Sequence, residues 1–190
     1  EDLVILNSSG DLVKIKTDNG KIYWTLSALG SFYAHDTDFF RSSNVVLVDN
    51  DIIFSTSTTT FSFSLITGQY NWESEIGSIN TPIIDGNNIF LMTDNGYFAN
   101  LNRKNGKIIW STNTLKILKK KKQITKIAGY ILGSNKVYIV TQNGYLIICS
   151  ANSGKVESFK KIGDTINTNP IISNGSLYIL TENSKIIGFN

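Results

Sequence analysis

The segment Asn105-Gly106-Lys107-Ile108-Ile109-Trp110 places a tryptophan four residues after a glycine. The same motif occurs earlier as Asn19-Gly20-Lys21-Ile22-Tyr23-Trp24 and as Thr67-Gly68-Gln69-Tyr70-Asn71-Trp72. A fourth copy, Ser153-Gly154-Lys155-Val156-Glu157-Ser158, keeps the glycine and has serine at the tryptophan position. A motif that returns at regular intervals indicates an array of one supersecondary unit. We therefore interpret the chain as a repeat protein.

The residues around each motif follow a pattern typical of antiparallel hairpins. The apolar run Ile89–Met92 leads into the turn Asp94-Asn95-Gly96, and the turn Arg103-Lys104-Asn105-Gly106 precedes the next strand. Asn-Gly supplies the positive φ angles that two-residue hairpin turns need. Many segments alternate apolar and polar residues, and none shows helical spacing with a suitable cap. The predicted fold class is all-β.

The predicted strands group into units of four, which is the composition of a β-propeller blade. Pro82 and Pro170 occupy equivalent positions in two units, and proline is tolerated at the first residue of a strand. The predicted repeats are approximately 1–28, 42–76, 79–114, 127–162 and 166–190.

Both terminal repeats are incomplete on this alignment. The first lacks its inner strand and the last lacks its outer strand, so we expect three strands, then three complete blades, then three strands. Residues 1–190 thus form a single partial propeller of about four and a half blades. A free sheet edge is avoided in closed propellers. We therefore expect the chain to be the C-terminal portion of a longer ring.

The composition argues against several classes of function. The net charge of +3 gives no reason to expect nucleic acid as a partner. No apolar run approaches the roughly 20 residues that span a bilayer. The single cysteine, Cys149, cannot form an internal disulfide, and no Cys/His spacing indicates zinc.

The repeated aromatic and turn residues are predicted to dock one blade on the next. Each tryptophan is expected to lie flat between neighbouring blades, and a buried indole N–H usually finds an acceptor. Ser158 removes the ring from one seam, which should therefore be looser or packed differently. The predicted blade-docking residues are Trp24, Trp72, Trp110, Gly20, Gly68, Gly106 and Gly154.

These repeats resemble the PQQ-like propeller repeat of quinoprotein dehydrogenases and, more closely, of the BamB family of outer-membrane assembly lipoproteins. The segment Leu65–Ile79 is similar to that family's run of a glycine, a tryptophan and then E-L-G-S-V. The segment Ile84–Leu91 is similar to its D-G-N-R-I-Y-L. The pair Asn169–Ile172 and Gly188–Asn190 resembles its C-terminal end.

The resemblance implies an eight-bladed propeller that is anchored by an N-terminal lipid to the periplasmic face of the outer membrane. It implies a non-catalytic scaffold that binds the periplasmic domains of BamA and assists β-barrel insertion. One feature departs from the family: an Asp-rich stretch that contributes to the BamA contact aligns with Arg41–Asn44 here. That electrostatic contact cannot be carried over to this chain.

Two insertions are candidate binding loops, since repeat proteins place insertions on one face, often the binding face. They span roughly Leu29–Arg41 and Leu115–Ala128. The first contains aromatic and arginine side chains of the types found at interface hot spots. The candidate partner-binding residues are Phe32, Tyr33, Phe39, Phe40 and Arg41. The alternative is that these aromatics pack on the surface of their own blade.

The second insertion contains Lys119-Lys120-Lys121-Lys122, which could meet anionic headgroups or an acidic partner. A solvated loop is the alternative explanation. In the first insertion, His35 and Asp36 suggest a metal or acid–base group only weakly, because no second ligand is in view.

No catalytic, cofactor-binding or metal-binding residue is predicted, and the chain is not expected to be an enzyme. Two other functions remain open. A quinone-dependent or other small-molecule-binding propeller is one, although such dehydrogenases typically carry a calcium site and an adjacent cysteine pair, and this chain has one cysteine. An extracytoplasmic sensor domain is the other.

Overall fold

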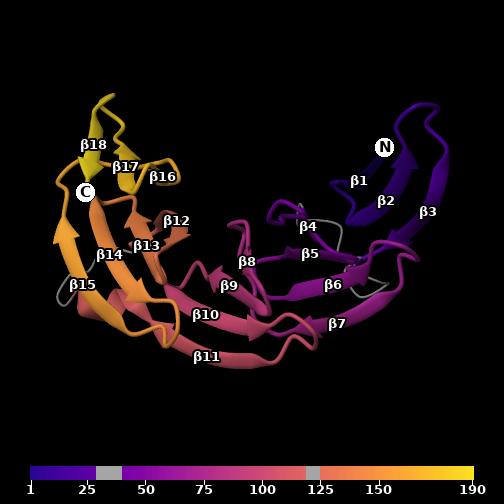
Figure 1. Ribbon diagram of the computed structural model, residues 1–190, viewed down its shortest axis with the longest axis horizontal. Helices are drawn as coiled ribbons and strands as arrows, with labels where there is room; N and C mark the ends of the chain where they lie inside the picture. The colour runs from indigo at the N-terminus through magenta and orange to yellow at the C-terminus, as the bar shows by residue number, and fades with distance from the viewer. Residues whose placement is uncertain (29–39, 119–124) are drawn as a thin grey trace. The chain divides into compact units, whose positions relative to one another are not determined.

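The computed structural model describes residues 1–28, 40–118 and 125–190. These residues form antiparallel sheets whose strands are joined by hairpins (Figure 1). One short 3-10 helix, η2 (Thr114–Ile117), lies in the connection between two of the sheets. The predicted all-β class is confirmed. The chain divides into two compact units, Glu1–Pro82 with Lys104–Gly106, and Ile83–Arg103 with Lys107–Asn190. No helix within the described ranges is long and apolar enough to cross a membrane.

The first unit contains two sheets. The first sheet has the strands β1 (Asp2–Leu6), β2 (Asp11–Lys16) and β3 (Ile22–Ser27), paired in that order. The second has β4 (Val46–Val48), β5 (Asp51–Ser55), β6 (Thr60–Ser64) and β7 (Tyr70–Ser74), also in chain order. Both are meanders, because each strand pairs with the one that follows it.

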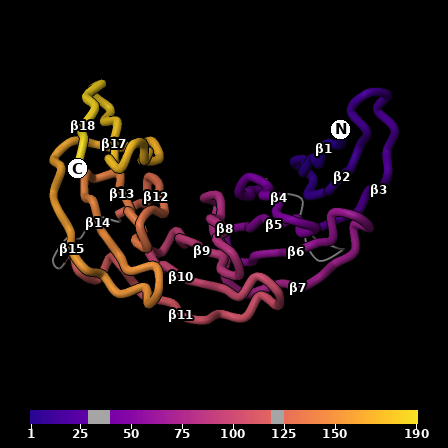
Figure 2. The backbone as a smooth tube through the Cα atoms, viewed as in Figure 1, coloured from indigo at the N-terminus to yellow at the C-terminus, as the bar shows by residue number. Residues whose placement is uncertain are grey.

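The second unit contains three sheets, and Figure 2 lets the reader follow the hairpins along the backbone. The first has β8 (Ile83–Asp85), β9 (Asn88–Met92), β10 (Tyr97–Asn102) and β11 (Ile108–Asn113). The second has β12 (Ile127–Gly133), β13 (Lys136–Thr141), β14 (Tyr145–Ser150) and β15 (Val156–Lys161). The third has β16 (Ile171–Ser173), β17 (Ser176–Leu180) and β18 (Ile186–Phe189). The predicted order of three, four, four, four and three strands is therefore observed.

Local chemistry explains the turns between the strands. The motif glycines Gly20, Gly68, Gly106 and Gly154 have φ angles of 68°, 74°, 68° and 67°. Glycine is favoured there because it has no Cβ, and the left-handed region with positive φ is costly for residues that have one. At another turn, the Thr141 hydroxyl oxygen accepts the N–H of Tyr145 at 3.0 Å. This bond gives the first residue of β14 a side-chain acceptor at the turn.

A β-bulge recurs at the same place in every repeat that has an outer strand. The register between the outer strand and the strand before it shifts after Lys14, Ser62, Asn100 and Ile148. The extra residue lies on the outer strand, one position before the tryptophan or Ser158, as Ile109 does before Trp110. A bulge breaks the alternation of faces. It therefore explains why two successive residues, Ile108 and Ile109, are both half exposed.

Each unit has its own apolar core. In the first unit, Leu12 packs with Ile52, Phe54 and Phe63. In the second, the apolar run Ile89–Met92 on β9 contributes side chains that are at most 3% exposed. The sheet β12–β15 is apolar on both faces: one cluster contains Val137, Ile139, Ile147 and Cys149, and another contains Val140 and Leu146 with Leu177 and Ile179.

Candidate functional site

The first unit brings each motif tryptophan against the turn glycine of the following repeat. A Cβ placed on Gly68 would lie 2.9 Å from Cδ2 of Trp24, and one placed on Gly106 would lie 2.4 Å from Cε3 of Trp72. Contacts below 3.0 Å cannot be accommodated without a shift, so only glycine allows this approach. A Cβ placed on Gly20 would have no atom within 4 Å, so the positive φ alone explains why glycine occupies this position.

The second unit repeats this arrangement once. A Cβ on Gly154 would lie 2.5 Å from Cζ3 of Trp110 and 3.0 Å from Oγ1 of Thr112. The ring of Trp110 also meets the edge of Phe98, with centroids 4.9 Å apart. The predicted docking residues thus lie together in pairs, each tryptophan with the glycine of the next motif. Their contribution to blade docking stays a prediction.

The expectation that each buried indole N–H finds an acceptor is wrong for Trp24 and Trp110. Among the described residues, neither indole Nε1 has a hydrogen-bond partner. The residue directly across the sheet from Trp24 is Lys14, whose ammonium can only donate. The residue across from Trp110 is Asn100, whose amide donates to Asn88 Oδ1 at 2.9 Å. Packing, rather than hydrogen bonding, therefore orients these two rings.

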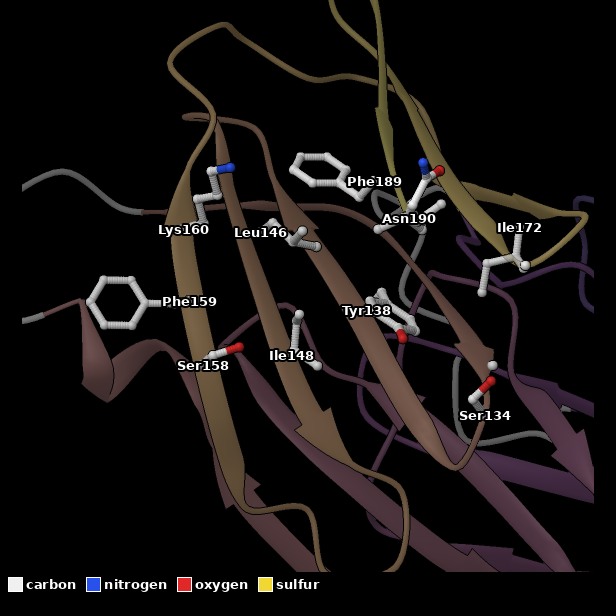
Figure 3. Close-up of a pocket in the computed structure, with 13 residues that line it drawn as sticks. Ser134, Tyr138, Leu146, Ile148, Ser158, Phe159, Lys160, Ile172, Phe189 and Asn190 are labelled. Carbon is white, nitrogen blue, oxygen red and sulfur yellow. The ribbon is translucent and has the colours of Figure 1, made fainter.

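The repeat without tryptophan has a different composition across the same ladder. Ser158 on β15 lies opposite Ile148, whereas Trp110 on β11 lies opposite Asn100. In this repeat the outer strand carries the polar residue and the strand before it the large apolar one, which is the reverse of the repeat with Trp110. Beside Ser158 the second unit has a groove of about 520 Å³ between the sheets β12–β15 and β16–β18 (Figure 3). Its lining includes Tyr138, Leu146, Ile148, Ser158, Leu177 and Phe189.

Sequence reasoning anticipated a looser seam at Ser158 but not this groove. The signal that could have found it is the residue opposite, because an isoleucine at the position of Asn100 adds apolar surface where the ring is missing. The uncovered apolar side chains are the kind of lining that binding grooves have.

The candidate partner-binding loop is only partly described. Phe40 is half-buried and packs against the core cluster of the first unit, which contains Leu12 and Phe54. Arg41 follows it and is exposed. Phe32, Tyr33 and Phe39 lie outside the described residues, as do His35, Asp36 and Lys119–Lys122.

Two buried groups in the second unit's core, Cys149 and Tyr130, have raised pKa values and stay protonated near neutral pH. Burial, with a smaller effect from Glu157, raises the pKa of the Cys149 thiol to about 12. Burial also raises the pKa of Tyr130 far above its ordinary value, and its hydroxyl donates to the carbonyl of Phe90 at 3.1 Å. A thiol in this state is a poor nucleophile. Within the described part of the chain, no three His, Cys, Asp or Glu side chains group as metal ligands would.

The comparison with protein families identifies the repeats. The model described as "Outer membrane protein assembly factor BamB" matches residues 1–112. The chain belongs to the BamB family. Comparison with curated proteins finds no match.

Solved structures share the BamB-like fold. BamB from Moraxella catarrhalis is 17% identical, with a TM-score of 0.72 over 99% of this chain and 58% of that chain. The computationally designed Ika8 protein is 11% identical, with a TM-score of 0.73 over 99% of this chain and 55% of that one. This chain therefore spans a little over half the length of these two proteins.

A quinohemoprotein alcohol dehydrogenase from Comamonas testosteroni has the same type of fold. It is 18% identical, with a TM-score of 0.55 over 64% of this chain and 21% of that chain. At such identities the likeness concerns the fold alone, since one fold supports many functions. Membership of the BamB family, rather than this likeness, guides the functional proposal.

Proposed function

We propose that this protein is a non-catalytic scaffold subunit of the outer-membrane β-barrel assembly machinery. In this role it binds the periplasmic domains of BamA and assists barrel insertion. The observation that carries the proposal is the BamB family match over residues 1–112. The proposal includes a location at the periplasmic face of the outer membrane and an N-terminal lipid anchor, which would lie outside residues 1–190.

The segment at Phe40 and Arg41 is the proposed contact surface. Phe40 is fixed by packing on the core of the first unit, and this anchors the exposed Arg41 beside it. An arginine held near aromatic side chains is a common interface hot spot, because its guanidinium can form several hydrogen bonds at once. The proposed surface also includes Phe32, Tyr33 and Phe39, outside the described residues.

Binding to the purified periplasmic domains of BamA from the same organism tests this proposal. Isothermal titration calorimetry with the full chain should give saturable binding, and Arg41→Ala should weaken it by about tenfold, the loss expected for a hot-spot residue. Lys21→Ala serves as the matched control, because it removes one exposed positive charge from the same unit at a motif turn. Absence of binding by the unmodified chain would refute the proposal.

A titration with pyrroloquinoline quinone and calcium separates the scaffold from the quinone-dependent alternative. The scaffold predicts no saturable change in the quinone absorption spectrum. A saturable change at micromolar quinone would instead favour a cofactor-binding propeller. Fractionation of envelopes tests location, since the proposal requires the full-length protein to sediment with outer membranes.

A further inference from the structure

Several asparagines in the chain are followed directly by glycine. This dipeptide is chemically labile, because glycine has no side chain to shield its backbone nitrogen from the asparagine amide beside it. The sequence makes these pairs alike, so a difference in their reactivity has to come from the fold. The pairs are Asn19–Gly20, Asn95–Gly96, Asn105–Gly106, Asn143–Gly144 and Asn174–Gly175.

Most of these glycines are protected within their turns. The N–H groups of Gly20, Gly96 and Gly144 each donate to a backbone carbonyl at 2.9 Å. Gly106 is buried, and the ring of Trp72 lies against it. A backbone nitrogen in either situation cannot attack a neighbouring amide until the hydrogen bond is broken or the ring is displaced.

The pair Asn174–Gly175 has no such protection. It forms the two-residue turn between β16 and β17 (Figure 1), with φ angles of 50° and 78°. Positive φ at both positions is the type I′ geometry, in which the ladder resumes at the flanking residues, here Ser173 and Ser176. Both turn residues are exposed. Within the described part of the chain, neither the Gly175 N–H nor the Asn174 amide has a hydrogen-bond partner.

We propose that Asn174 is a site of spontaneous deamidation. The backbone nitrogen of Gly175 attacks Cγ of Asn174, the bond from Cγ to Nδ2 breaks, and ammonia leaves with the proton of the Gly175 N–H. Water then opens the five-membered imide at one of its two carbonyls, which yields aspartate or isoaspartate. The inference is independent of the proposed function, because it uses none of the residues assigned to BamA binding.

Either product changes the turn. Aspartate adds a negative charge, and isoaspartate also adds a methylene group to the backbone. The length of a turn fixes the register of its hairpin, so the longer backbone should weaken the pairing of β16 with β17. Strand β16 has only the residues Ile171–Ser173 and pairs with no other strand among the described residues. Deamidation should therefore loosen the first strand of this sheet.

Peptide mapping by mass spectrometry measures the reaction at each pair while the full chain is kept at mildly alkaline pH. Asn174 should deamidate at least about fivefold faster than Asn19, Asn95 or Asn143, the factor expected where reaction first breaks one net hydrogen bond. The same chain unfolded in guanidinium chloride is the control. There all the pairs should react at similar rates, because each asparagine has the same following residue.

A grafted pair tests whether the place in the fold sets the rate. Ser134 and Asn135 form the equivalent exposed turn between β12 and β13, with φ angles of 51° and 59°. The combined substitutions Ser134→Asn and Asn135→Gly should create a second fast site in that turn. Asn174→Gly is the matched control at the natural site, because glycine tolerates its positive φ and has no amide to lose. Amide exchange in β16 should rise with time in the unmodified chain and stay constant in this variant.

Three outcomes would overturn the proposal. In the folded chain, Asn174 could react no faster than Asn19, Asn95 and Asn143. Its faster reaction could persist in guanidinium chloride, which would mean that the flanking residues rather than the turn set the rate. The grafted pair could also react as slowly as the protected ones, which would mean that an exposed turn of this type does not permit the attack.

Discussion

Trp72 lies so close to Gly106 that a Cβ on the glycine would stand 2.4 Å from Cε3 of the indole. The two residues belong to successive copies of the same motif. A copy thus contributes its glycine to the contact with the preceding repeat and its tryptophan to the contact with the following one. The glycine is therefore required twice, once for its φ of 68° and once for the ring above it. These two requirements can be separated by experiment.

Gly106→Ala should destabilise the chain more than Gly20→Ala. Both glycines have a φ of 68°, so both variants incur the strain of a left-handed residue, about 1–2 kcal/mol. Only Gly106 has a ring in the way, and the overpacking should add about 1–3 kcal/mol. Urea unfolding followed by circular dichroism measures both losses. Equal losses would show that the indole moves aside freely.

Trp72→Ala should lower the free energy of unfolding by about 3–5 kcal/mol, the range for a large aromatic removed from a core. The side chain is 7% exposed, so little of its surface is already in water. Ile22→Ala is a suitable comparison, because Ile22 is 58% exposed and its loss should stay near or below 1 kcal/mol. A loss for Trp72 of similar size would mean that the ring contributes little to the seam.

Tyr130→Phe should cost about 1 kcal/mol, since it removes one buried hydrogen bond and little volume. The lost bond runs from the Tyr130 hydroxyl to the Phe90 carbonyl and joins the sheets β8–β11 and β12–β15 within the second unit. Tyr178→Phe, at a side chain 39% exposed, should be nearly neutral. Thermal unfolding of the two variants side by side makes the comparison, and an unchanged midpoint for Tyr130→Phe would contradict it.

The stability of the chain should fall as pH rises from about 9, and Cys149 should contribute to the slope. Burial raises the pKa of this thiol from 9.0 to about 12, so between these values the unfolded state loses a proton that the folded state keeps. The contribution is complete below pH 9 and decreases by up to about 1.4 kcal/mol per pH unit above it.

Denaturant unfolding at several alkaline pH values measures this effect. The stability of Cys149→Ala should depend less steeply on pH than that of the unmodified chain, while other titrating groups affect both equally. Curves that run parallel between pH 9 and pH 11 would show that the thiol does not contribute. Below pH 8 the native thiol should also resist labelling with Ellman's reagent, since it is fully buried.

The candidate site could be foreseen only in part. The loop with Phe40 and Arg41 is visible in the sequence as an insertion, and its aromatic composition indicates a contact surface. Whether Phe40 faces a partner or its own core depends on neighbours from β2 and β5, distant in sequence, and the structure packs it on that core. The groove depends likewise on side chains from two sheets, which no single segment reveals.

The all-β class, the hairpin turns and the order of three, four, four, four and three strands could be predicted from the amino-acid residues alone. These features follow from short-range physics: an Asn-Gly turn needs positive φ, and a strand with one buried face needs alternation. Only the tertiary structure shows that Trp72 covers Gly106, that the indole N–H groups of Trp24 and Trp110 have no acceptor within the described part of the chain, and that a groove lies beside Ser158. Such contacts join side chains from successive repeats, which are separated by whole strands, and local periodicity carries no information about which side chains meet across a seam.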